Sequence, residues 1–255
     1  MNRILTVPFA CLFSVIYLWA QETPPKTEPK IQEAKTPEGM PTADEILDEY
    51  VKASGGKAAI EKLTSRETKG TFEVPALGAS GTLEGYAKAP NKILMIITIP
   101  AFGTIQQGSD GTIAWEENPQ VGMRELSGSE LEARKRDTDF YRIIHLKDLY
   151  PKRTLKGIEK VGDQEAYVVE LTPSEGSSEK MYFDKESRLL IRHELERESP
   201  QGKITIETRL EDYRDVDGVK LPFLLHQSLP MMSWDIKFEQ VKHDTTIDDA
   251  KFKKP

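Results

Sequence analysis

A change in the spacing of apolar residues after Ser65 constrains this chain more than any other feature of its sequence. From there on, apolar side chains recur at every second position, most clearly over 204–210 and 234–241. A period of two is typical of a β-strand that buries one face. Weaker alternation runs through 167–171 and 189–195, and Gly-Asp, Asp-Gly and Pro-Gln-Gly turn signals separate these segments. Short strands divided by such turns predict successive antiparallel hairpins.

Helical signals are confined to two parts of the chain. Thr42 and Glu45 form a capping box before apolar residues at helical spacing, and Gly55-Gly56 ends that predicted helix. We expect a second short helical piece over 57–63 and one or two inserted helices over 126–149. About ten strands with these helices predict an α+β fold, either an open curved sheet wrapped around helices or a complete barrel.

The first 20 residues have the form of a signal peptide. Arg3 supplies a positive start, an apolar run follows over 4–19, and Ala20 precedes a polar segment. The run is slightly short for a bilayer span, which needs about 20 residues, and Pro8 interrupts it. We therefore expect Sec-type export, cleavage after Ala20 and a periplasmic location, with a retained membrane anchor as the alternative.

The segment 21–41 differs in composition from the rest of the chain. It is rich in Pro, Lys, Glu and Thr and nearly lacks apolar side chains. Such a segment cannot offset the entropy lost on ordering, and its prolines keep it extended. We expect a disordered tether here, followed by a single domain over 42–255.

Composition and charge exclude several classes of protein. The chain is 38% hydrophobic, which is enough for a packed core, and its formal net charge of −7 is opposite in sign to that of a nucleic-acid binder. Its one cysteine, Cys11, lies in the predicted leader. The mature chain can therefore form neither an intramolecular disulfide nor a thiolate metal site.

No catalytic or metal-binding motif is evident. The four histidines show neither H-x-H nor H-x-x-x-H spacing, and there is no G-x-S-x-G motif. An enzyme hypothesis would rest on His193 beside Glu194 or on His243 beside Asp244, but adjacent residues on a strand point to opposite faces. We interpret His193 as a hydrogen-bonded core residue on a strand face shared with Ile191. We expect no enzyme activity, no cofactor and no metal.

Glycine-rich and acidic segments have simple structural interpretations. The stretches 55–56 and 78–85 match neither a Walker loop nor a dinucleotide-binding motif, and we interpret both as turns. The acidic clusters 212–217 and 248–249 lack the ligand spacing of an EF-hand. We expect a solvated charged surface at both.

The segment 93–99 is apolar at nearly every position, unlike the other predicted strands. Both faces of such a strand must be covered. One face can meet the core, and the other requires a helix, a partner protein or a bound apolar ligand. Nearby methionines and aromatic residues would suit a lipid cavity, and they would equally fill an ordinary core.

Several short strings along 42–255 have the form of turn and strand signatures. They are Tyr50-Val51-x-Ala53-x-Gly55-Gly56, Pro90-Asn91-Lys92, Asp110-Gly111-x-x-Ala114-Trp115, Tyr182-Phe183-Asp184, Asp217-Gly218-Val219-Lys220-Leu221-Pro222 and Ile247-Asp248-Asp249-Ala250-x-Phe252-x-x-Pro255. Together with the exported leader they resemble the LolA-like superfamily, whose members sort lipoproteins to the outer membrane.

The resemblance implies a half-open antiparallel β-barrel of about 10–11 strands wrapped around helices. In this superfamily helices plug the concave side and enclose a hydrophobic cavity for acyl chains, and an arginine on an early strand bonds to the helical lid. Here Arg66 precedes the first clear strand, and early strand positions carry Lys69, Lys88 and Lys92. The implied function is transport in outer-membrane biogenesis.

We therefore predict a non-catalytic periplasmic carrier or binder that holds lipid or lipoprotein acyl chains in a hydrophobic cavity, with the helices of 126–149 as a movable lid. The alternative is a sensory or protein-binding module of the same fold without a lipid ligand. We expect a monomer, with an envelope protein as a further partner and no nucleic acid. The predicted lipid-binding residues are Ile93, Met95, Ile97, Ile99, Phe102, Trp115, Phe223, Leu225, Met231 and Trp234.

Overall fold

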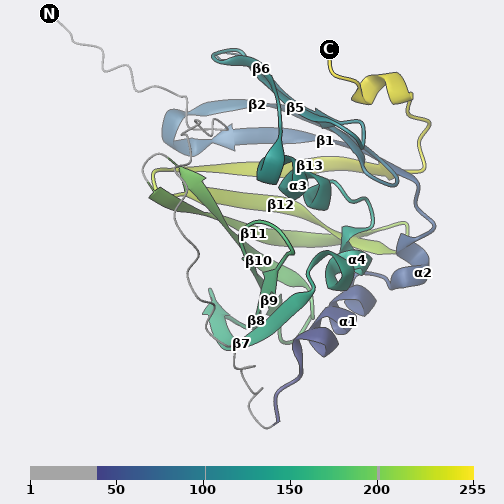
Figure 1. Ribbon diagram of the computed structural model, residues 1–255, viewed down its shortest axis with the longest axis vertical. Helices are drawn as coiled ribbons and strands as arrows, with labels where there is room; N and C mark the ends of the chain where they lie inside the picture. Colours follow the sequence, from purple (N-terminus) through teal and green to yellow (C-terminus); the bar gives the residue numbers. More distant parts are fainter. Residues whose placement is uncertain (1–38, 101, 200–201) are drawn as a thin grey trace, which may run out of the picture.

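Thirteen strands form one antiparallel sheet in the computed structural model, which describes residues 39–100, 102–199 and 202–255 (Figure 1). The predicted signal peptide and the predicted tether as far as residue 38 lie outside the described residues, so both stay predictions. Among the described residues there is no helix long and apolar enough to cross a membrane.

The elements follow one another along the chain with short connections. The strands are β1 Ser65–Val74, β2 Ala79–Lys88, β3 Lys92–Ile99, β4 Gly103–Ser109, β5 Ala114–Asn118, β6 Gly122–Glu125, β7 Lys152–Val161, β8 Gln164–Thr172, β9 Glu179–Asp184, β10 Leu190–Ser199, β11 Gly202–Val216, β12 Val219–Leu229 and β13 Met232–His243. The helices are α1 Ala43–Ala53, α2 Lys57–Ile60, α3 Gly128–Asp137 and α4 Arg142–Leu149, with 3₁₀ turns η2 Pro75–Leu77 and η3 Asp249–Phe252.

The sheet consists of two meanders, β1 to β6 and β7 to β13. Pairing of β1 with β13 joins them in the order β6-β5-β4-β3-β2-β1-β13-β12-β11-β10-β9-β8-β7. The edge strands β6 and β7 do not pair with each other, so the sheet is not closed. The helices predicted over 126–149 are α3 and α4, which connect these edges across one side of the sheet (Figure 1). The half-open α+β fold is confirmed, the complete barrel is wrong, and the sheet has more strands than predicted.

The predicted capping box begins α1. The Thr42 hydroxyl accepts a hydrogen bond from the backbone N–H of Glu45 at 3.2 Å, and the Glu45 carboxylate accepts one from the backbone N–H of Thr42 at 2.8 Å. These bonds satisfy N–H groups that a first helical turn leaves free. Gly55 follows the helix with φ +120°, and a Cβ there would lie 2.1 Å from the carbonyl oxygen of Gly218. The helix over 57–63 is shorter than predicted, because α2 ends at residue 60.

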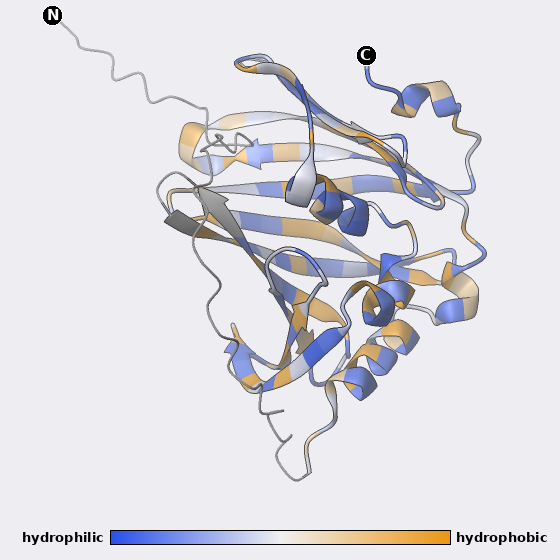
Figure 2. Cartoon of the chain, in the orientation of Figure 1, coloured by the Kyte–Doolittle hydropathy of each residue, from blue (hydrophilic) through white to orange (hydrophobic). Residues whose placement is uncertain are grey.

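Three clusters of buried side chains form the core on the concave side, where apolar residues alternate with polar ones along the strands (Figure 2). The first cluster joins Leu47 and Tyr50 of α1 and Tyr150 after α4 to β8 and β9. The second gathers residues of β1, β2, β3 and β13 around Phe72 and Trp234, whose ring centroids are 6.4 Å apart. The third joins α2 and the chain around the start of α4 to β12.

Both faces of β3 are covered by the chain itself. Ile99 points to the concave side and is 1% exposed. On the convex side Leu94 packs with Trp115 and with Ile247 and Phe252 of the C-terminal segment. The second face of this apolar strand is therefore covered by the C-terminal segment of the same chain, which includes the short 3₁₀ helix η3.

The glycine-rich stretch 78–85 is not a turn, as the sequence predicted. Gly78 ends η2, and the rest of the stretch belongs to β2. A Cβ at Gly81 would lie 2.2 Å from the carbonyl oxygen of Thr98. Glycine is needed here because β2 and β3 approach each other closely, a role that sequence alone does not distinguish from a turn.

A β-bulge at residues 190–192 changes the predicted alternation in β10. Because of the bulge, Ile191 packs with Tyr182 on the side away from α1 and α4, whereas His193 points to the concave side and pairs with Glu179. The prediction that His193 and Ile191 share a face is wrong. The interpretation of His193 as a hydrogen-bonded residue is confirmed.

Candidate functional site

The second cluster is an apolar patch on the concave face to which no described helix contributes a side chain. Leu225 lies directly opposite Leu210 on one neighbouring strand and Ile236 on the other, so these three side chains share a face. The half-buried apolar residues of this face are Met95, Phe102, Leu210, Leu225, Leu229, Met232 and Phe238. All of them come from strands and from the turn at Phe102. An apolar sheet face normally packs against a second layer, and here that layer is incomplete.

A row of hydrogen bonds crosses the same face from β13 to β11. The indole Nε1–H of Trp234 donates to Oε1 of Gln227 at 2.8 Å, and Nε2 of Gln227 donates to Oγ1 of Thr208 at 3.0 Å. Each polar atom of the row has a partner, so the row adds no unsatisfied group to the apolar surface. It also holds the indole of Trp234 beside Phe72.

Helix α3 is attached to the sheet by ion pairs. None of its residues is buried. Arg134 donates to Gln107 at 2.5 Å and to Glu116 at 2.7 Å, and Arg124 of β6 bridges Glu116 at 3.0 Å and Glu130 of the helix at 2.9 Å. The side chains of these pairs are 13–29% exposed, and α3 buries no residue of its own, so it is the least firmly held of the helices that cross the sheet.

Helix α4 is held by a buried carboxylate instead. Glu179 of β9 is 3% exposed, and it accepts a hydrogen bond from Arg142 at 3.0 Å and lies 2.7 Å from Nε2 of His193. Arg142 also donates to the Tyr150 hydroxyl at 2.8 Å. Burial alone would raise the pKa of Glu179, but the hydrogen bond with His193 and the charge of Arg142 outweigh it and lower the pKa to about 2. The carboxylate is therefore charged at neutral pH.

A cation lies on the concave face beside the segment that joins α3 to α4. Arg66 belongs to β1, not to the chain before the first strand as the sequence suggested, and its guanidinium carbon is 5.7 Å from the ring centroid of Phe140. Burial lowers the pKa of Arg66, and no carboxylate of the described residues pairs with it. Opposite it on β13, His243 lies 3.0 Å from Asp217, and its Nε2 has no partner among the described residues.

Each histidine pairs with a carboxylate, but never with its neighbour in sequence. His193 pairs with Glu179 and His243 with Asp217, so Glu194 and Asp244 are not the partners that the enzyme hypothesis named. The remaining pairs are His145 with Asp139 and His226 with Asp235. Within the described ranges, no group of three or more His, Cys, Asp or Glu side chains is arranged to hold a metal.

The structure brings part of the predicted lipid-binding set together. Met95, Ile97, Ile99, Phe102, Leu225 and Trp234 belong to the second cluster. Phe223 lies in the third cluster and Ile93 at the far end of β3 from Ile99. Trp115 faces the convex side, and Met231 is 97% exposed in the turn between β12 and β13. The binding role of all these residues stays a prediction.

Sequence reasoning missed four residues of this face, Leu210, Leu229, Met232 and Phe238. The alternation in β11 and β13 already marked Leu210 and Phe238 as members of an apolar face, so that signal was sufficient to find them. The alternation could not show that the apolar face of these strands stays partly exposed. That exposure depends on where the helices pack against the sheet.

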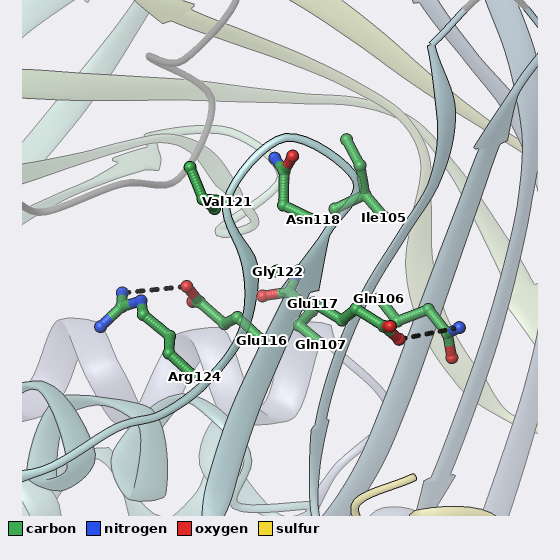
Figure 3. A pocket seen from close by; sticks show the side chains of 9 residues that line it. All are labelled: Ile105, Gln106, Gln107, Glu116, Glu117, Asn118, Val121, Gly122 and Arg124. Atoms are coloured by element: carbon green, nitrogen blue, oxygen red, sulfur yellow. Dashed lines mark hydrogen bonds and ion pairs between the residues drawn. The ribbon is translucent and has the colours of Figure 1, made fainter.

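Two recesses lie near the margins of the sheet. The first, of about 320 Å³ with open solvent included, is lined by Ile105, Gln106, Gln107, Glu116, Glu117, Asn118, Val121, Gly122 and Arg124. Figure 3 shows Arg124 directed at Glu116 and Gln106 at Glu117, so these polar groups are paired with one another, and the surface that lines the recess is mostly apolar. The second, of about 1000 Å³ with open solvent included, lies between the start of α1 and the rings of Tyr167 and Phe183.

Comparison with solved structures shows which proteins share this architecture. A DUF1329 family protein from Desulfovibrio piger superposes with a TM-score of 0.57 at 18% identity, over 83% of this chain and 97% of that one. A LolA superfamily protein from Nitrosomonas europaea gives 0.56 at 16% identity, over 84% and 99%. A putative outer membrane lipoprotein-sorting protein domain from Vibrio parahaemolyticus gives 0.57 at 13% identity, over 82% and 97%.

No family model matches the chain, and no curated protein matches its sequence. The likeness is one of fold, because all three identities are below 20%. It extends over nearly the whole of each solved structure. The chain therefore has the fold of the LolA superfamily and of lipoprotein-sorting domains, as its turn and strand motifs predicted.

Proposed function

We propose that this protein binds the acyl chain of a lipid or lipoprotein on the concave face of its sheet and carries it through the periplasm without covalent chemistry. The observation that carries the proposal is the second cluster, an apolar patch built from strands, whose centre is buried and whose members Met95, Leu225 and Met232 are partly exposed. Solved structures described as LolA superfamily and lipoprotein-sorting proteins have the same fold, which supports this function.

Burial of hydrocarbon provides enough free energy for such binding. Each buried CH₂ group contributes about 0.8 kcal/mol, so half of a sixteen-carbon chain contributes about 6 kcal/mol before the cost of ordering. Methionines at the patch, Met95 and Met232, add side chains that adapt to irregular ligands. Micromolar affinity requires about 8 kcal/mol, which a somewhat longer buried segment supplies.

The unequal attachment of α3 and α4 supports a movable cover over this face. The ion pairs of Arg134 and Arg124 hold α3 from its surface, and they can break and re-form without moving any buried side chain of α3. The buried Glu179 keeps α4 in place meanwhile. We propose that α3 moves to admit the ligand while α4 stays on the sheet.

A charge placed on the concave face tests the proposal. Leu225→Glu puts a carboxylate into the apolar patch, and Leu224→Glu puts the same group on the opposite face of the same strand. Both leucines are half-buried, so the two variants are matched in burial. Binding of a fluorescent fatty acid should fall at least about tenfold in Leu225→Glu and change little in Leu224→Glu.

Native mass spectrometry of the wild-type protein, after gentle recovery from the cell envelope, gives an independent test. We expect a co-purified species with the mass of a lipid or an acylated peptide. If the wild-type protein is always empty and does not bind fatty acid, a carrier role is rejected. The alternative function, a protein-binding module of the same fold, would then remain. Circular dichroism of both variants establishes that a loss of binding does not come from unfolding.

A further inference from the structure

Four hairpin turns lie at the same end of the sheet, on the left side of Figure 1. They are η2 between β1 and β2, and the turns between β3 and β4, β5 and β6, and β12 and β13. The strand register places them together, because Glu73 at the end of β1 is opposite both Ser80 and Asp235, which lie beside their turns. We call the described residues of these turns, 75–80, 99–100, 102–104, 118–122 and 229–233, the apolar rim.

The apolar rim has no charged residue. Its segments read Pro-Ala-Leu-Gly-Ala-Ser, Ile-Pro-Ala-Phe-Gly-Thr, Asn-Pro-Gln-Val-Gly and Leu-Pro-Met-Met-Ser, in a chain that is 30% Asp, Glu, Lys and Arg. Surface turns are usually polar and charged, so four consecutive uncharged turns along one edge are unusual. Beyond β12, Glu175 brings charge to the turn between β8 and β9.

The exposed apolar side chains of the molecule are concentrated in this rim. Within the described part of the chain, the large hydrophobic residues that are exposed are Leu77, Val121 and Met231, at 48%, 57% and 97%. Each lies at the tip of a different hairpin. Exposed apolar side chains scattered over a surface need no explanation, but their gathering on one uncharged edge indicates a contact surface.

The turns at the opposite end of the sheet have the reverse character. Lys88 and Lys92 flank the turn between β2 and β3, Asp110 begins the turn after β4, and Asp217 lies in the turn between β11 and β12. The two ends therefore differ sharply in charge, and only the apolar rim can approach a nonpolar medium at low desolvation cost.

We infer that the apolar rim docks the protein on the surface of a lipid bilayer, with Leu77, Val121 and Met231 inserted among the lipid chains. The rim follows eight neighbouring strands, which at about 4.8 Å per strand spread the three tips over roughly 30 Å. Isolated apolar tips spread this widely, without charges or buried polar groups to define a partner, match a broad apolar layer better than a protein surface.

Docking at this rim would place the candidate site beside the membrane. Ile99, Leu229 and Met232 belong both to the second cluster and to the ends of the strands that carry the rim. A lipid chain leaving the bilayer would therefore meet the half-buried patch without passing a charged turn. This inference rests on the proposed function. It identifies a lipid bilayer as the membrane from which the protein takes its acyl chain, or to which it delivers it.

Vesicle co-sedimentation tests the inference with protein recovered from the periplasm of an expression host. One set of vesicles contains phosphatidylethanolamine and phosphatidylglycerol, and the other only phosphatidylcholine. The wild type should bind both, and high salt should not release it, because the contact is apolar. The triple variant Leu77→Ser, Val121→Ser, Met231→Ser should lose at least about tenfold in binding.

A matched control replaces three exposed charged residues away from the rim, in the triple variant Lys62→Ser, Glu239→Ser, Lys242→Ser. It should bind vesicles like the wild type. Three results would each overturn the inference. They are a wild type that does not bind vesicles, a rim variant that binds as well as the wild type, and wild-type binding that needs anionic lipid and disappears in high salt. The double variant Leu77→Ser, Val121→Ser, which keeps the predicted lipid-binding residue Met231, should bind vesicles more weakly but still bind fluorescent fatty acid in solution, so a failure of the rim is distinguishable from a failure of the acyl-chain site.

Discussion

Arg142 of α4 donates a hydrogen bond to the buried carboxylate of Glu179 on β9, at 3.0 Å. This contact, together with the His193 pair on the same carboxylate, fixes one end of the connection that crosses the concave face. The carboxylate is 3% exposed, so its charge depends on its partners and not on water. The stability of the protein and the position of α4 should therefore respond to the protonation of one residue.

Acid should weaken the fold through Glu179. Its pKa is about 2 in the folded protein against an ordinary value of 4.5, so its stabilising contribution is complete above that ordinary value and disappears as pH falls toward 2. A shift of this size corresponds to about 3 kcal/mol. Denaturant unfolding at pH 7, 5, 4 and 3 should show a steeper loss for the wild type than for Glu179→Gln. Parallel pH profiles for the two proteins would contradict the assignment.

Removal of Arg142 alone should destabilise the protein more than removal of the whole pair. Arg142→Met leaves the buried carboxylate of Glu179 without its cation, and we expect a loss of about 3–5 kcal/mol in the free energy of unfolding. The double variant Arg142→Met, Glu179→Leu removes the charge as well and should recover at least half of that loss. Chemical denaturation measures both, and a purely additive double variant would reject the pairing.

Helix α3 should open without unfolding the rest of the protein. Arg134→Ala removes its contacts with Gln107 and Glu116, and α3 buries no residue of its own, so the global free energy of unfolding should change by no more than about 1 kcal/mol. Hydrogen exchange over 128–137 should accelerate at least about tenfold, since local opening requires less free energy. Lys135→Ala is the control, because Lys135 pairs with Glu132 inside the helix. Equal exchange in both variants would count against the movable cover.

The elements that local periodicity determines were predictable from sequence. The Thr42 capping box, the inserted helices and the alternation in β11 and β13 all appear where expected. Each depends on residues within a few positions of one another, so a window of sequence contains the whole signal. Alternation does not order the strands, so it could not show by itself that Leu225 and Trp234 lie near each other on one face.

The parts that were not predictable depend on distant residues. Nothing local links Arg142 to Glu179, or Leu94 to Phe252, and these contacts form only when the sheet curls. The bulge in β10 has no glycine or proline to mark it, so Ile191 was assigned to the wrong face. Coverage of the concave face likewise depends on helix placement, which periodicity cannot specify.

The glycine that ends α1 should be replaceable only at high cost. Gly55 and Gly56 both have positive φ, +120° and +82°, but a Cβ at Gly55 would lie 2.1 Å from the Gly218 carbonyl oxygen, whereas one at Gly56 meets nothing within 4 Å. Both alanine variants carry backbone strain from a positive φ. The difference between their melting temperatures therefore reports the steric contact with the Gly218 carbonyl oxygen. Gly55→Ala should lower the melting temperature several degrees more than Gly56→Ala. Equal losses would mean that α1 and the β11–β12 turn separate easily.

The C-terminal segment should act as the convex cover of the apolar strand. Phe252 is fully buried against Trp115 and Leu94, and its ring fills a site that no other described residue occupies. Phe252→Ala should cost about 3–5 kcal/mol and shift Trp115 fluorescence to longer wavelength as water reaches the indole. Fatty-acid binding should persist at temperatures where the variant stays folded, because the concave face of β3 is unchanged. Lys254→Ala, which removes only an exposed pair with Glu125, is the control. A variant with native stability and an unshifted spectrum would show that the strand does not need this cover.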